Sequence, residues 1–153
     1  MVVILEEDSV RFSESKLSKS VFARLYLQYD CDRYFPEYGW DDFAEIVLEW
    51  WMNSAASLIK YGGSSIFRFM DGGFSFEIVV DNNGNFHVEL RENLETTLIQ
   101  DVDFMGFCQS LMAASNLLIR RMQEISKDRD ISSTLVLQQN VLRNLLKKLK
   151  SSS

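Results

Sequence analysis

Cysteine, proline and histidine are scarce in this chain of 153 residues, which contains two cysteines, one proline and one histidine. Cys31 and Cys108 are too few and too far apart to predict a disulfide scaffold or a four-ligand zinc site. Pro36 is the single proline, and no stretch rich in Gly, Ser or Pro divides the sequence. We therefore predict one domain over residues 1–150, followed by a short polar tail at 151–153.

Long hydrophobic runs and an excess of positive charge are also missing. No stretch approaches the roughly 20 apolar residues of a membrane span, and no cationic segment precedes the apolar residues 2–5. We therefore expect a cytoplasmic protein that does not bind a membrane. The chain has 16 Lys plus Arg against 22 Asp plus Glu, a formal net charge of -6. This balance argues against a nucleic-acid partner, because phosphate contacts need basic side chains.

Catalytic motifs are absent as well. The sequence has no Gly-x-Ser-x-Gly, no His-Glu-x-x-His and no glycine-rich phosphate loop. The only histidine, His87, shares its predicted strand face with Glu89 and Arg91, which is typical of a surface position. We therefore predict a protein that is not an enzyme and that uses no cofactor and no metal.

Several segments have the residue alternation or the turn boundaries of strands. Glycines and asparagines at 71–73 and 82–85 supply the positive φ angles of tight hairpins, so the strands around them form an antiparallel meander. The predicted strands cover residues 2–12, 21–29, 65–70, 74–80, 86–91 and 95–101.

Helical spacing of apolar residues predicts three helices. The first runs from about 40 to 61, with an Asp42-x-x-Glu45 capping box and a glycine stop. The second begins after Asp103 and ends near 125, and a polar break at 126–130 separates it from the third, at 132–149. We thus predict an α+β domain in the order ββαβββ(β)αα, with one antiparallel sheet of five to six strands covered by the Trp-rich first helix and the C-terminal helices. Its predicted core includes Phe43, Val47, Trp51, Phe76, Ile78, Val88 and Leu90.

Negative charge is concentrated in one window. Residues 30–49 contain seven acids and a single base, Arg33. On a helical wheel the acids of the first helix share one side, whereas Trp50 and Trp51 fall on the other. This acidic side is either a solvated helix face or a docking surface for a basic partner, and nearby tyrosines favour docking. The candidate partner-binding residues are Asp30, Asp32, Tyr34, Glu37, Tyr38, Asp41, Asp42, Glu45 and Glu49.

Three sequence segments resemble a known class of bacterial proteins. They are Phe35-Pro-Glu-Tyr-Gly-Trp-Asp-Asp-Phe43, Val47-Leu-Glu-Trp-Trp51 and Arg68-Phe-Met-Asp-Gly-Gly-Phe74. Over about residues 2–100 the layout is similar to that of immunity proteins of polymorphic-toxin systems. The resemblance implies a cytoplasmic protein that binds and blocks a cognate toxin domain made by the same cell. The acidic window suits a basic, nuclease-type toxin.

A second function class stays open. Small acidic secretion chaperones also bind effector proteins, and they act as dimers. The leucine stripe of residues 131–149 is a candidate dimer face for that function. An immunity protein, by contrast, acts as a monomer or a homodimer.

Overall fold

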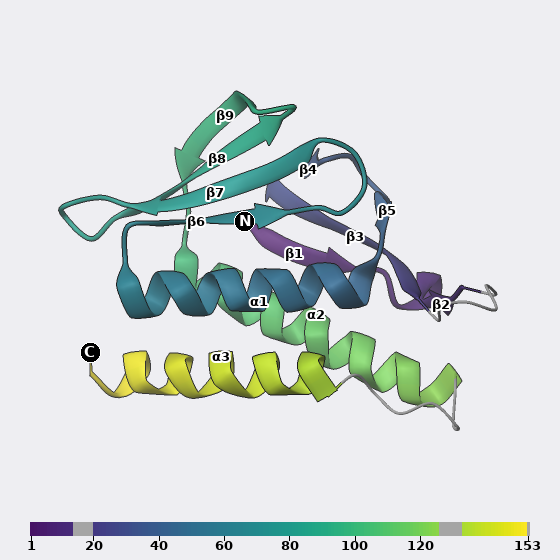
Figure 1. The fold of residues 1–153 in the computed structure, drawn as a ribbon. Helices are drawn as coiled ribbons and strands as arrows, with labels where there is room; N and C mark the ends of the chain where they lie inside the picture. Colours follow the sequence, from purple (N-terminus) through teal and green to yellow (C-terminus); the bar gives the residue numbers. More distant parts are fainter. Residues whose placement is uncertain (14–19, 126–132, 153) are drawn as a thin grey trace.

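The computed structural model describes residues 1–13, 20–125 and 133–152, and it has antiparallel sheets on one side and three helices on the other (Figure 1). The predicted α+β class is confirmed. The prediction of one sheet is wrong, because the described strands form a five-stranded and a four-stranded sheet. The long strand β3 (Val21–Asp30) accounts for the difference, since it collects the short N-terminal strands around itself.

The five-stranded sheet is built on β3, with which every other strand of the sheet pairs in antiparallel register. A single strand over 2–12 is not formed, because the 3-10 turn η1 (Glu7–Ser9) interrupts it. The four strands that pair with β3 are β1 (Val2–Leu5), β2 (Arg11–Phe12), β4 (Arg33–Phe35) and β5 (Asp41–Asp42).

The four-stranded sheet is the predicted meander, with the strands in sequence order. Gly72 and Gly84, with φ angles of 68° and 83°, lie in the first two turns of the meander, as their tolerance of positive φ predicts. Side chains alternate between a buried face, with Phe76, Ile78, Val88 and Leu90, and an outer face. The strands are β6 (Ser64–Arg68), β7 (Phe74–Val80), β8 (Phe86–Glu92) and β9 (Glu95–Asp101).

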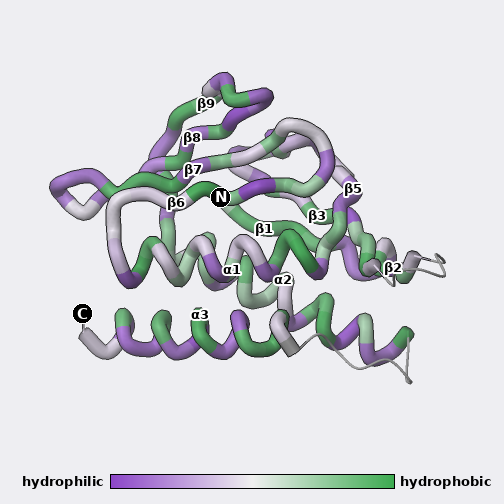
Figure 2. Tube along the Cα trace, viewed as in Figure 1, coloured by the Kyte–Doolittle hydropathy of each residue, from purple (hydrophilic) through white to green (hydrophobic). Residues whose placement is uncertain are grey.

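The helices are α1 (Ala44–Tyr61), α2 (Phe104–Ile125) and α3 (Ser133–Ser151), and α1 lies between the sheets and α3 (Figure 1). Hydrophobic and hydrophilic residues alternate along α3 (Figure 2), and its buried leucines are Leu135, Leu142 and Leu146. These three leucines pack within the chain, whereas Leu149 of the same stripe is exposed. No described helix is long and apolar enough to cross a bilayer.

The core is centred on aromatic side chains from both halves of the chain. Phe67 and Phe76 stack with their ring centroids 4.8 Å apart, and Phe107 of α2 meets both rings edge-on. All but one of the side chains predicted for the core are buried. The exception is Phe43, which is partly exposed and packs on Phe22 with centroids 4.4 Å apart.

Helices α1 and α2 begin differently. The predicted cap of α2 is confirmed, since a carboxylate oxygen of Asp103 accepts the N–H of Gly106 over 3.0 Å. The predicted capping box of α1 is wrong, because Asp42 ends strand β5 and the N-cap residue, Phe43, makes no side-chain cap bond. The polar break at 126–130 lies outside the described residues.

Candidate functional site

The β3–β4 hairpin presents the exposed part of the acidic window. Its turn passes through Asp32, whose φ of 55° is a left-handed conformation that Asp and Asn tolerate better than most residues. Asp30 helps to shape the turn, because its Oδ1 accepts the N–H of Cys31 over 2.7 Å. Both carboxylates are exposed, as is that of Glu37. The hairpin thus holds acidic groups in solvent on a defined backbone.

Tyrosine rings gather on this hairpin and on the segment that connects β4 to β5. Tyr34 and Tyr38 meet with ring centroids 5.0 Å apart, and each also contacts Tyr26 of β3, at 5.7 and 5.5 Å. Tyr38 is 68% exposed, whereas Tyr26 lies buried beneath the other two rings. Burial and the neighbouring Glu6 carboxylate raise the pKa of Tyr26 well above its usual value. We call Asp30, Asp32, Tyr34, Glu37 and Tyr38 the hairpin patch.

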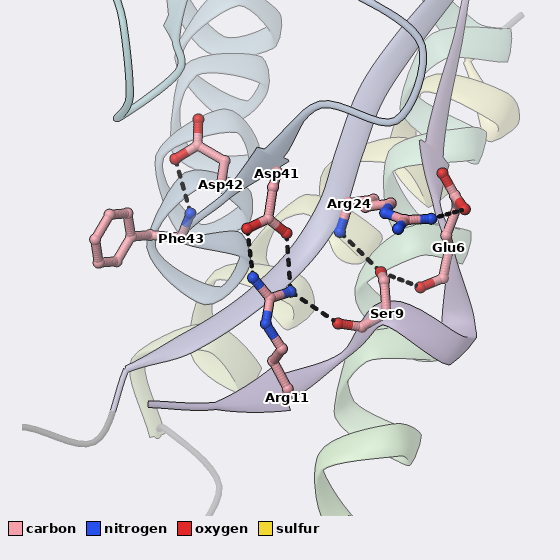
Figure 3. A network of polar contacts seen from close by, with 7 residues as sticks. All are labelled: Glu6, Ser9, Arg11, Arg24, Asp41, Asp42 and Phe43. Atoms are coloured by element: carbon pink, nitrogen blue, oxygen red, sulfur yellow. Dashed lines mark hydrogen bonds and ion pairs between the residues drawn. The ribbon is translucent and has the colours of Figure 1, made fainter. Parts of the chain in front are cut away.

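A polar network borders this region (Figure 3). Arg11 of β2 donates to both carboxylate oxygens of Asp41 of β5, from Nη1 over 2.9 Å and from Nη2 over 2.5 Å, which raises the pKa of Arg11. Arg24 of β3 pairs with Glu6 at 3.3 Å. These two ion pairs face a groove of about 510 Å³. Asp41 is therefore accessible but already paired.

Asp42 does not belong to the accessible set, which corrects the prediction from the helical wheel. In Figure 3 its side chain points away from the Arg11–Asp41 pair, and it is 1% exposed. Its oxygens accept N–H groups from the Trp40 indole at 3.1 Å, from Phe43 at 2.7 Å and from Asp71 at 3.3 Å. Its role is to join α1 and β5 to the β6–β7 turn.

Glu45 and Glu49, which are candidate partner-binding residues, are less accessible than the helical wheel predicts. Both are partly buried on α1, and each makes a polar or electrostatic contact within the chain. Trp50, predicted on the apolar side, is 41% exposed. It lines a groove with Asn53 and Ile66. The accessible surface of α1 is therefore mixed, and the acids brought together in solvent are those of the hairpin patch.

Sequence reasoning missed three contributors to this region, namely Glu6, Arg11 and Tyr26. Glu6 and Arg11 flank the 3-10 turn, and only the pairing of β1 and β2 with β3 brings them beside Asp41 and the tyrosines. The place of Tyr26 in the site could have been predicted from strand alternation. This residue lies two positions before Gln28, the cross-strand partner of Tyr34, so both rings share one face of the hairpin.

His87 lies partly buried on the outer face of β8, where Val79 and Asp101 are its cross-strand neighbours. No group of three or more possible metal ligands occurs within residues 1–13, 20–125 and 133–152. The two cysteines are separate, since Cys31 is exposed and Cys108 is buried. Burial raises the pKa of the Cys108 thiol to about 12, which disfavours the nucleophilic thiolate.

We expect His87→Ala to leave the fold intact. In the described part of the chain no hydrogen bond joins His87 to a nucleophile or a general base, and its cross-strand neighbour Val79 needs no polar partner. The free energy of unfolding should change by less than about 1 kcal/mol. Urea unfolding followed by circular dichroism gives the change. A larger loss would assign the His87 ring a structural role.

Comparison with known proteins finds no matching family, no matching curated protein and no matching solved structure.

Proposed function

We propose that this chain is a non-enzymatic, cytoplasmic immunity protein that binds and blocks a cognate toxin domain, with the hairpin patch as part of its interface. The resemblance of residues 2–100 suggests the class, and the hairpin patch is the observation that favours a binding role. It combines exposed acids with tyrosine rings held in mutual contact. Tyrosine is enriched at binding hot spots, because it buries a large area with little loss of side-chain freedom.

The chemistry of the patch suits a partner rich in Lys and Arg. Cations pack against tyrosine faces and pair with carboxylates that are still exposed. The one base in the acidic window, Arg33, is exposed at the start of β4. A basic toxin domain therefore meets a surface that steers it in solution and offers rings to bury on contact.

The proposal predicts that the protein encoded immediately upstream is the partner. Co-production of the two proteins should yield a stable complex and relieve the toxicity of the upstream protein in bacteria. Survival without complex formation would contradict direct blocking, and a complex without protection would contradict the immunity role.

Charge removal at the hairpin should slow association. We expect Asp30→Asn with Asp32→Asn to lower the association rate by up to about tenfold at low salt, with little change in dissociation. Asparagine keeps the Oδ1 acceptor at residue 30 and tolerates the positive φ at residue 32, so the turn should persist. The measurement is stopped-flow association with the upstream protein at two salt concentrations.

A control with the same charge change separates steering by the patch from an effect of net charge. Gln123→Lys with Glu124→Gln also makes the net charge more positive by two, at the exposed end of α2. The control should associate nearly as fast as the parent protein. At about 1 M salt, where the Debye length is about 3 Å, all three rates should converge. If both double variants slow association equally, the hairpin patch has no specific role in binding.

A further inference from the structure

The two edge strands of the four-stranded sheet, β6 and β9, differ in how far other parts of the chain cover them. At β6, the outward carbonyls are covered by side chains of α1. The Ser54 hydroxyl donates to the carbonyl of Ile66 and the Trp51 indole donates to that of Arg68, each over 2.8 Å. These bonds occupy acceptors that an added strand would need, so the β6 edge is closed.

The β9 edge lacks such cover. The N–H of Val102 donates to the carbonyl of Phe86 over 3.0 Å, which identifies the hydrogen-bonded pairs between β8 and β9. Because bonded and non-bonded pairs alternate, the N–H and C=O groups of Ile99 and Asp101 point outward. Within the described residues, β8 is the only strand that pairs with β9. The strand has no Pro, Lys or Arg, the residues that commonly protect an edge.

Exposed apolar side chains accompany this open edge. Ile99 is 59% exposed, and Leu94, in the hairpin turn before β9, is 86% exposed. The turn is strained, since Asn93 and Leu94 have φ angles of 50° and 71°, and a two-residue turn of this kind favours glycine at its second position. A large apolar residue is therefore held in solvent at the start of a free strand, at a conformational cost.

The charge around β9 is mainly negative. On the outer face, Glu89 of β8 lies between Ile99 of β9 and Glu77 of β7. One base, Arg91, pairs with both carboxylates, at 3.1 Å from Glu89 and 3.4 Å from Glu77. Glu95 and Asp101 are exposed on β9 itself.

The β3–β4 hairpin is joined to β9 by a hydrogen bond. The Gln100 side chain of β9 donates to the carbonyl of Tyr29 over 2.8 Å, and Asp30 follows Tyr29 in the chain. The C-terminal end of β9 thus lies next to the hairpin patch.

We propose that the free edge of β9 receives an extended, basic segment of the partner protein as a fifth strand. Outward groups of Ile99 and Asp101 form the main-chain bonds, Ile99 contacts an apolar side chain, and Lys or Arg of the segment pairs with the exposed carboxylate of Asp101. This inference rests on the proposed function, because it takes the toxin domain as the partner. A second copy of the chain is the less suitable occupant, since β9 would offer its own acids no bases.

The test combines amide exchange with edge variants, using the intact chain and the upstream-encoded protein. In the complex, hydrogen exchange at the Ile99 and Asp101 amides should slow by at least about tenfold, because both become hydrogen-bonded. Ile99→Pro removes one outward N–H without touching the β8–β9 ladder, and should weaken binding by about tenfold. Ile99→Lys, which should repel a basic strand, is the second variant if proline disturbs folding.

Ile66→Lys is the matched control, because Ile66 lies on the same outer face at the closed edge. It should bind within about twofold of the parent protein. If a complex forms but both amides exchange as in the free chain, the edge inference is overturned while the immunity function stands. If no complex forms, the proposed function fails and the inference fails with it. Protection that appears in the chain alone and grows with its concentration would identify a second copy as the occupant, against the inference.

Discussion

Replacing Trp51 with alanine should lower the free energy of unfolding by about 3–5 kcal/mol. The side chain is fully buried, and its ring meets those of Phe69 and Phe76 edge-on, with centroids 5.0 and 5.2 Å away. Its indole N–H also satisfies the Arg68 carbonyl. Alanine therefore leaves a cavity and an unpaired acceptor at the junction of α1 and β6. Urea unfolding followed by circular dichroism gives the change.

The chain supplies its own control in the neighbouring tryptophan. Trp50 is 41% exposed, so Trp50→Ala removes an indole at the adjacent position without opening the core. Its cost should stay below about 1.5 kcal/mol. Similar losses for the two variants, or a loss below about 1 kcal/mol for Trp51→Ala, would place Trp51 outside the core.

Asp42→Asn should destabilise the protein by about 1–3 kcal/mol. Three N–H groups converge on this buried carboxylate, and the amide nitrogen of asparagine would face at least one of them as a second donor. Asp41→Asn is the matched control, because its side chain is 42% exposed and its ion pair with Arg11 lies at the surface. That control should cost less than about 1 kcal/mol.

The advantage of Asp42 over asparagine should also depend on pH. Burial raises the pKa of Asp42 above its ordinary value of 3.8, against the opposing effect of its hydrogen bonds. The folded protein then retains this proton where the unfolded chain has lost it, so the contribution to stability is largest at low pH and falls as pH rises through the folded pKa. Asparagine does not titrate. The stability difference between parent and variant should therefore narrow as the pH rises above about 3.8, and a difference that widens would mean that the pKa is lowered.

Local signals predicted those parts of the fold that are determined locally. The meander follows from its turn residues, and α2 begins where the Asp103 cap predicts. In β7 and β8 the two-residue period identifies the buried face, because only one side of that sheet is covered. These elements need no knowledge of distant contacts.

The errors arise where distant segments decide the outcome. A wheel drawn through Asp42, Trp50 and Trp51 assumes one continuous helix, whereas pairing of residues 41–42 with β3 makes them a strand. The choice between the two tryptophans depends on where β6 lies against α1. In the site, the exposed acids and two tyrosines were predicted, but Glu6 and Arg11 join them only through β-sheet register.

The unequal edges of the four-stranded sheet also bear on polymerisation. Growth of a fibre by strand addition needs two complementary free edges on every subunit. Here the carbonyls of Ile66 and Arg68 are occupied by α1, so among the described residues the four-stranded sheet of a molecule joined through β9 offers no equally free second edge. Removing the hydroxyl of Ser54 together with the indole of Trp51 would expose that edge. The same hydrogen bonds that anchor α1 on β6 thus also prevent strand addition at that edge.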